Sequence, residues 1–188
     1  MKNIITILFV FICVFGFSQT KNDTIDFNNV NYGLLNDLIF QKHNEERLKI
    51  GRQVRIEDNI CKSASQYQVG YMSQYSEVCH DNDKVFNGVI LHTPLDRFNY
   101  FSKGSKLGQT YHGEICYNFF SGKTHKITYE QLAQQTITAF MESTSHKAIM
   151  LSRLTCLSKQ YGYFSTTSTL KNGYFNFFVT GFFTYRME

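Results

Sequence analysis

The C-terminal region contains the pattern that most restricts how this chain can fold. Residues 175–182 carry Phe, Val and Gly at one set of alternating positions and mainly Phe and Thr at the other, so a strand there is largely apolar on both faces. Asn172-Gly173 precedes this strand and is typical of the two-residue type I′ turn of a β-hairpin, whose other strand is expected over residues 161–166. Because both of its faces are apolar, the second strand is expected to be central in a sheet and covered by helices.

Two helices are expected in the first half of the chain. From Tyr32 the apolar residues recur at spacings of three and four, and Gly51 ends that pattern. Asp58 is a favoured N-cap residue for a second helix, whose apolar positions share one face: Ile60, Ala64, Tyr67 and Tyr71. Residues 19–31 are polar and are expected to form a flexible lead-in to a single domain over residues 32–188.

The segment between residues 76 and 126 shows no clean periodicity and is rich in glycine and histidine. We expect loops and irregular structure there, with a short helix near residues 94–100. After it, Thr128 and Gln131 have the spacing of a capping box that opens a third helix, and a helical turn is expected at residues 146–151. Helices followed by a sheet predict an α+β fold.

Residues 1–18 have the features of a secretory signal peptide. Lys2 supplies a positive charge, the apolar run over residues 4–17 is too short to span a bilayer as a helix, and Gly16 and Ser18 are small residues suited to a cleavage site. We therefore expect cleavage near Ser18 and a secreted or periplasmic protein with no transmembrane span after processing. An uncleaved N-terminal anchor is the alternative.

Removal of that segment would leave four cysteines: Cys61, Cys79, Cys116 and Cys156. An even number of cysteines in an exported protein predicts two disulfides, with free buried thiols as the alternative. The net charge of +4 is small and scattered, which disfavours nucleic acid as a partner. A mean hydropathy of −0.27 excludes a protein with several membrane spans.

The sequence lacks the motifs of common nucleotide-binding, zinc-protease and α/β-hydrolase sites, including H-E-x-x-H and G-x-S-x-G. The remaining candidates lie in or beside the glycine-rich segment: His80, Glu114 and His146. Imidazole is a common ligand of divalent metals, and a carboxylate completes such a site or orients bound water. The histidines without a sequence partner are expected to be hydrogen-bonded structural groups: His43, His92 and His125.

Several short motifs also occur in one particular order along the chain. They are N-E-E-R at residues 44–47 with Gly51, I-E-D-N-I at residues 56–60, His80, T-P-L-D-R-F at residues 93–98, Gly113-Glu114, F-M-E-S-T-S-H-K at residues 140–147, and the strand pair between Gly162 and Phe182. In this order they resemble the CAP superfamily of cysteine-rich secretory, antigen 5 and pathogenesis-related 1 proteins, also called the SCP domain. The resemblance covers residues 34–184.

The resemblance implies a three-layer α-β-α sandwich with a central antiparallel sheet. His80, Glu114 and His146 would line a shallow open cleft in which a divalent cation, zinc in the first place, can bind. Ile115 stands where the family signature has asparagine, and Ser143 stands where eukaryotic members have a second glutamate. The chain therefore resembles a bacterial-type site of two histidines and one glutamate.

The same resemblance bears on the cysteines. If the site residues converge as it implies, Cys79 and Cys116 become neighbours and would form one disulfide. Cys61 would then pair with Cys156.

Three functions are compatible with these features. The first is a secreted binding module that holds a metal in the cleft and engages an extracellular ligand, lipid or protein; the absence of a recognisable set of nucleophile, base and orienting residue favours it. The second is a metal- or carboxylate-dependent hydrolase of peptidase type, with Glu114 as the candidate catalytic base; Ser143 and Ser145 are weaker candidates, since hydroxyls at a helix break commonly cap it. The third is a binder of sterols or fatty acids in the Phe-rich hairpin, unless those rings are simply core.

Overall fold

The computed structural model describes residues 19–105, 108–122, 126–153 and 158–187. Its centre is a sheet with the strand order β1-β3-β4-β2. The long strands β2 (Thr110–Gly122), β3 (Ser158–Lys171) and β4 (Tyr174–Met187) are antiparallel, and the two-residue strand β1 (Ile56–Glu57) adds a parallel edge to β3. The sheet is therefore mixed rather than purely antiparallel.

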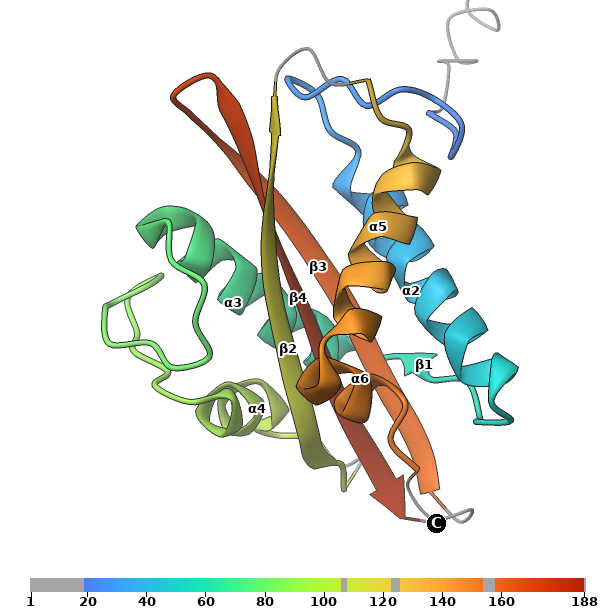
Figure 1. Ribbon diagram of the computed structural model, residues 1–188. Helices are drawn as coiled ribbons and strands as arrows, with labels where there is room; N and C mark the ends of the chain where they lie inside the picture. Colours follow the sequence, from blue (N-terminus) through green and yellow to red (C-terminus); the bar gives the residue numbers. More distant parts are fainter. Residues whose placement is uncertain (1–18, 106–107, 123–125, 154–157, 188) are drawn as a thin grey trace, which may run out of the picture.

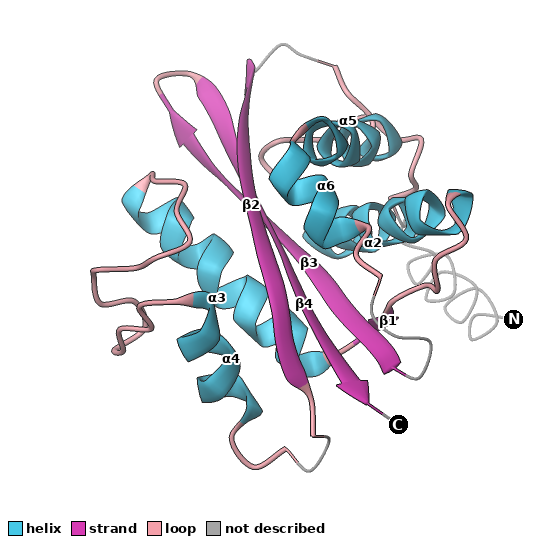
Figure 2. Cartoon of the chain, turned by 60° about the horizontal axis from the view of Figure 1, so that its bottom comes forward, coloured by secondary structure: helices cyan, strands magenta, loops and turns pink. Residues whose placement is uncertain are grey.

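Helices cover both faces of this sheet (Figures 1 and 2). One layer contains α2 (Tyr32–Lys49), α5 (Tyr129–Glu142) and α6 (Thr144–Met150), and the other contains α3 (Asn59–Tyr75) and α4 (Pro94–Ser102). The predicted α+β class and its α-β-α layers are confirmed. No helix in the described part of the chain is long and apolar enough to cross a membrane.

Strand β4 is central, as its two apolar faces predicted. Phe177 and Phe183 pack into the core on the α2 and α5 side, whereas Phe178 packs with Val69 on α3, and all three Phe rings are fully buried. The β3–β4 turn has positive φ at Asn172 and Gly173, 52° and 81°, as a type I′ turn requires. The central strand and its turn were predictable because each depends on residues close together in the sequence.

Side-chain caps fix the helix starts. Asp58 accepts hydrogen bonds from the backbone of Ile60 and Cys61, and Thr128 and Gln131 form both bonds of the predicted capping box. The short turn expected at residues 146–151 is a helix that begins two residues earlier, at Thr144. Its N-cap residue makes no side-chain cap bond, so the expectation that a hydroxyl caps this break is wrong there.

Strand β2 was expected to be irregular, and this expectation is wrong. One face of the strand carries Ile115 and Tyr117, and the other carries Glu114, Cys116 and Asn118. The side chains therefore alternate with period two, but polar and apolar residues are not cleanly separated between the two faces. A buried carboxylate on one face and glycine on the other conceal that period. Strand β2 stands at one end of the strand order, next to β4, and is therefore an edge strand of the sheet (Figure 2).

The N-terminal predictions have different outcomes. The signal peptide over residues 1–18 lies outside the described residues. The lead-in over residues 19–31 is anchored, because the Ile25 amide donates to the Ile127 carbonyl at 2.9 Å and the Ile25 side chain is buried.

The disulfide predictions are wrong for every cysteine that the structure describes. Cys61, Cys79 and Cys116 are free thiols, and Cys156 lies outside the described residues. Cys79 and Cys116 do pack in one apolar cluster with Val69 on α3, so the expected proximity is present without the bond.

Candidate functional site

Three side chains from separate segments meet beside the edge strand β2. Glu114 lies on β2, Arg97 lies on α4, and His80 lies in the loop that follows α3. The alternation along β2 directs Glu114 and Cys116 toward the α3 and α4 layer. We call His80, Arg97 and Glu114 the cleft cluster.

Arg97 and Glu114 form a fully buried ion pair. Arg97 Nε donates to Glu114 Oε2 at 3.1 Å, and Arg97 Nη2 donates to Oε1 at 2.8 Å and Oε2 at 2.9 Å. The same guanidinium donates to the backbone carbonyls of His80 at 2.6 Å and Leu91 at 3.2 Å. Arg97 therefore neutralises the carboxylate and fixes the loop that carries His80.

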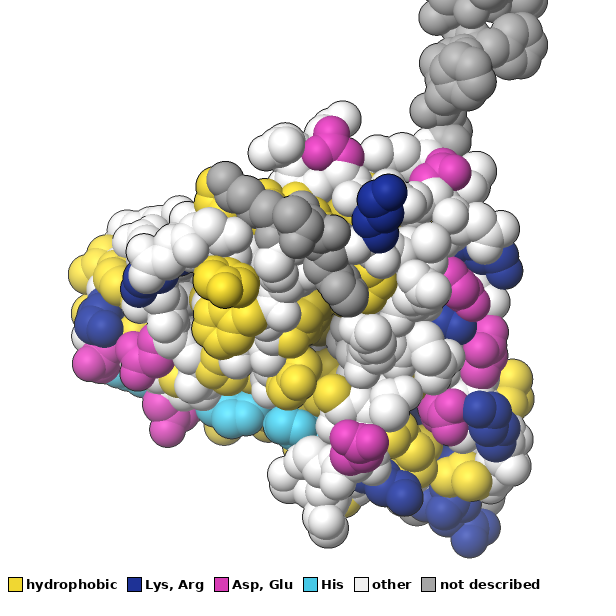
Figure 3. Space-filling model, turned by 45° about the horizontal axis from the view of Figure 1, so that its top comes forward, with side chains coloured by type: hydrophobic (Ala, Val, Ile, Leu, Met, Phe, Trp, Pro, Cys, Tyr) yellow, Lys and Arg dark blue, Asp and Glu magenta, His cyan; other side chains and the backbone are white. Residues whose placement is uncertain are grey.

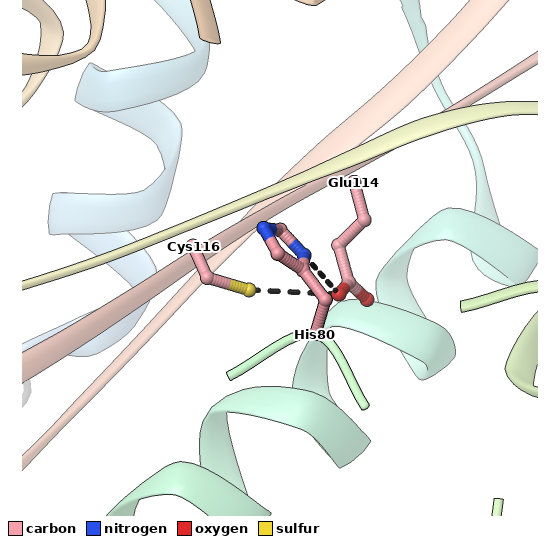
Figure 4. A group of neighbouring side chains, drawn as sticks. All are labelled: His80, Glu114 and Cys116. Atoms are coloured by element: carbon pink, nitrogen blue, oxygen red, sulfur yellow. Dashed lines mark hydrogen bonds and ion pairs between the residues drawn. The ribbon is translucent and has the colours of Figure 1, made fainter. Parts of the chain in front are cut away.

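His80 connects this buried pair to solvent. Its Nδ1 lies 3.1 Å from Glu114 Oε1, and its side chain is 46% exposed (Figure 4). Because an ionised carboxylate only accepts hydrogen bonds, Nδ1 carries the proton and Nε2 keeps its lone pair when the ring is neutral. A carboxylate that orients a histidine in this way is typical of metal sites.

The loop around His80 is held by buried amides. Gln68 donates to the Cys79 carbonyl at 2.6 Å, and Asn82 donates to Gln68 Oε1 at 2.9 Å. His92 Nδ1 lies 3.0 Å from the Asn82 carbonyl, which agrees with the structural role expected for His92. The imidazole of His80 is thus presented on a rigid support.

His146 approaches from the opposite helical layer. It is half-buried in α6, where its ring packs edge-on against Phe140 at 5.3 Å, and its pKa is lowered by burial and by the charge of His80. This effect on the pKa indicates that the two imidazoles lie within electrostatic range, but His146 is not among the possible ligand atoms that lie within 4.8 Å of one another, which come from His80, Glu114 and Cys116. Gly113 permits this approach, since a Cβ there would lie 2.8 Å from Ile149 Cγ2 on α6.

Cys116 is a neighbour that the sequence did not single out as a site residue. Its Sγ lies 3.5 Å from Glu114 Oε1 and 3.7 Å from Thr180 Oγ1. One donor atom each from Cys116, Glu114 and His80 lie within 4.8 Å of one another (Figure 4). The sequence did contain one indication that Cys116 belongs to the site. It lies two residues after Glu114, and this spacing places both side chains on one face of a strand.

The contacts of Glu114, Cys116 and the two serines bear on the hydrolase alternative. The Glu114 oxygens accept from two Arg97 nitrogens, from His80 and from Cys116, which leaves this carboxylate poorly placed to take a proton from water. Burial and the charge of Glu114 raise the pKa of the Cys116 thiol well above its usual range, so it is a poor nucleophile. Ser143 and Ser145 hydrogen-bond each other at 3.3 Å.

Two buried arginines and two neighbouring histidines lie on the α2 side of the sheet. We call this group the clamp cluster: Arg47, Arg55, His43 and His112. Arg47 donates to the Met150 carbonyl at 2.6 Å, and Arg55 donates to the Ile149 carbonyl at 2.8 Å. The Arg55 guanidinium also stacks 3.9 Å from the centre of the Phe183 ring. Within the described residues, neither arginine has a carboxylate partner.

Burial and the two arginines lower the pKa values of the clamp histidines. The pKa of His43 lies well below its ordinary value, first because of burial and then because of Arg55 and Arg47. The pKa of His112 is lowered to about 4, mainly by burial and next by Arg55. His43 is fully buried and its Nε2 lies 3.3 Å from Arg55 Nη1, which agrees with the structural role expected for it, while His125 lies outside the described residues.

The fold and the cleft cluster together define an α-β-α sandwich protein with a histidine–carboxylate–arginine site at an open sheet edge. The chain resembles an outer surface protein from Borrelia burgdorferi, with 14% identity and a TM-score of 0.47 over 85% of this chain and 96% of that one. It also resembles an extracellular protein containing an SCP domain from Bacillus anthracis, with 12% identity and a TM-score of 0.40 over 77% of this chain and 39% of that one. No family model and no curated protein matches the chain. Because both TM-scores are below 0.5, these similarities carry no argument about the site, and its function has to be inferred from its own geometry.

Proposed function

We propose that this chain is an exported, CAP-like binding module whose cleft takes a divalent metal ion, zinc in the first place, through His80 and His146. The observation that carries the proposal is the bond from His80 Nδ1 to Glu114, which leaves Nε2 of a half-exposed ring free to bind. His146 supplies a second imidazole from the facing helix. Both nitrogens are ligands that zinc prefers.

Glu114 acts in this proposal mainly through His80. Its charge is already matched by Arg97, and orienting an imidazole requires only one of its oxygens. Two imidazoles leave coordination positions for water or for a group on an extracellular ligand or protein. The site then serves recognition, and the hydrolase alternative has less support because no activated nucleophile accompanies it among the residues that the structure describes.

The proposed location is extracellular or periplasmic. It rests on the charged, apolar and small residues of the N-terminal segment, which are typical of a signal peptide. The two exported proteins named above are consistent with this location.

The direct test is calorimetric titration of the protein with zinc. Binding should be lost in a His80→Ala/His146→Ala double variant and retained in a His112→Gln variant, which removes a histidine outside the cleft. Equal binding by the wild type and the double variant would refute the proposal.

A second candidate function is the binding of an apolar ligand. A cavity of about 120 Å³ lies between the end of β2, β4 and α5, and its wall includes Phe27, Phe119, Phe177 and Leu132. Figure 3 shows apolar side chains gathered on this face of the molecule. Ser121, which also lines the cavity, has a buried hydroxyl without a hydrogen-bond partner in the described structure.

Displacement of a fluorescent fatty acid tests this second candidate. We expect binding that survives His80→Ala but is lost in Leu132→Trp, which fills the cavity. Binding that is equal in wild type and Leu132→Trp would exclude this cavity as the ligand site.

A further inference from the structure

On its buried side, the cleft cluster adjoins sulfur-bearing and apolar side chains, and its only carboxylate there, Glu114, is paired with Arg97. Cys116 Sγ lies within 4.8 Å of a ring nitrogen of His80, the residue is 4% exposed, and Met72 is fully buried in the same apolar cluster as Cys116. Val69 and Phe178 complete that cluster and exclude water from the thiol. An ion that enters past His80 would therefore meet a soft donor in a dry environment.

We propose that Cys116 is the inner ligand of the cleft and makes the site selective for thiophilic cations, zinc or cuprous copper, over magnesium and calcium. This inference rests on the proposed function, because His80 belongs to both. Thiolate and imidazole favour such ions, whereas magnesium and calcium require oxygen ligands.

The geometry suits one ion shared by an imidazole and a thiolate. A ring nitrogen of His80 and Sγ of Cys116 lie within 4.8 Å of each other, which leaves room for a metal between them after small movements. Thr180 Oγ1, 3.7 Å from Sγ, is placed to donate a hydrogen bond to the sulfur once its proton has left. Glu114 keeps its bonds to Arg97 and orients His80 from outside the coordination sphere.

The charge balance distinguishes the two thiophilic ions. Arg97 and Glu114 together are neutral, so they do not offset the charge of a bound ion. On binding, the Cys116 thiol loses its proton to solvent and its sulfur lone pair bonds to the metal. The thiolate then neutralises a monovalent cuprous ion completely but leaves a zinc site with one buried positive charge, so cuprous copper should bind more tightly.

The experiment is an anaerobic titration of the protein with cobalt(II), an optical substitute for zinc, followed by competition for cuprous ion against a chromophoric chelator. We expect a near-ultraviolet thiolate-to-cobalt charge-transfer band in the wild type and in Cys79→Ser, a control for the neighbouring thiol. Cys116→Ser should lose the band and bind cuprous ion at least about 10-fold more weakly. Magnesium and calcium should not displace either ion, and circular dichroism checks that each variant is folded.

Cobalt binding without the band would overturn the role of Cys116 and leave the proposed function intact. Failure to bind any of these ions would overturn both. A band that persists in Cys116→Ser and disappears in Cys79→Ser would assign the ligand to the wrong thiol and refute the inference.

Discussion

The two faces of the sheet each bury arginine, and they do so in opposite ways. In the cleft cluster, Arg97 is neutralised by Glu114, and the pair continues into the half-exposed ring of His80. In the clamp cluster, Arg47 and Arg55 are satisfied by backbone carbonyls and by aromatic contact. The comparison distinguishes a cluster that exposes an imidazole to solvent from a cluster whose arginines hold separate segments of the chain in place.

The clamp has a clear structural task. Its arginines bind the carbonyls of Ile149, Met150 and Ser152, at and just beyond the C-terminal end of α6. Cations there complement the negative end of the helix dipole. Since α6 carries His146, the clamp helps to set the position of that imidazole.

The largest effect on stability is expected at Glu114. Glu114→Gln leaves the buried Arg97 charge unpaired, which should lower the free energy of unfolding by about 3–5 kcal/mol in urea denaturation. Glu130→Gln, at the partly exposed partner of Lys42, is the control and should cost less than about 1 kcal/mol. A loss below about 1 kcal/mol for Glu114→Gln would show that the ion pair does not organise the cleft.

The clamp should respond more mildly to removal of its charge. Arg55→Met keeps much of the side-chain volume and leaves no charge unpaired, but it removes one donor from the Ile149 carbonyl, which still accepts from the Ser152 hydroxyl at 3.0 Å. We expect a loss of roughly 1–3 kcal/mol in the same urea experiment. A loss larger than that of Glu114→Gln would reverse the comparison between the two clusters.

Acid should weaken the clamp first. The folded-state pKa of His112 is about 4, below the value of about 6.5 expected in the unfolded chain, so the unfolded chain binds the proton first. Stability from this ring is therefore complete above pH 6.5 and is lost as the pH falls toward 4. His43, whose pKa is also lowered, acts in the same direction.

Urea denaturation at pH 7 and pH 4.5 measures this effect. For the half-buried ring of His112 we expect about 1–2 kcal/mol, allowing for solvent screening. A His112→Gln variant should show a correspondingly smaller pH dependence. An unchanged pH dependence in that variant would contradict the assignment.

The smallest stability effect is expected at His146. It is half-buried and makes one aromatic contact, so His146→Ala should cost less than about 1 kcal/mol while abolishing tight zinc binding. Thermal denaturation and zinc calorimetry on the same sample separate the two effects. A large loss of stability with zinc affinity preserved would make His146 a structural residue.

Sequence patterns predicted the elements whose signals are local. The hairpin, the capped starts of α3 and α5, and the short helix α4 all depend on residues within a few positions of each other. Strand β2 was not predicted from the sequence, because the buried Glu114 pairs with Arg97, which lies 17 residues away on another element. An ion pair between residues on different elements produces no periodic pattern that a single sequence could show.

The site was predictable in part for the same reason. His80, Glu114 and His146 were selected from residue type and motif order, and the structure brings His80 to Glu114 and within electrostatic reach of His146. Arg97 was noted only as part of a motif, since its role depends on tertiary contact. Of the clamp arginines, Arg47 was likewise noted only as part of a motif and Arg55 was not noted, because bonds from arginines to backbone carbonyls cannot be predicted from side-chain patterns.

The central claim is that metal binds in the cleft and not at the clamp, and histidine side-chain resonances in a nitrogen–proton NMR spectrum test it most directly. On addition of zinc, the ring signals of His80 and His146 should shift while those of His43 and His112 stay in place. Unshifted signals from His80 and His146, or zinc-dependent shifts confined to His43 and His112, would contradict the account.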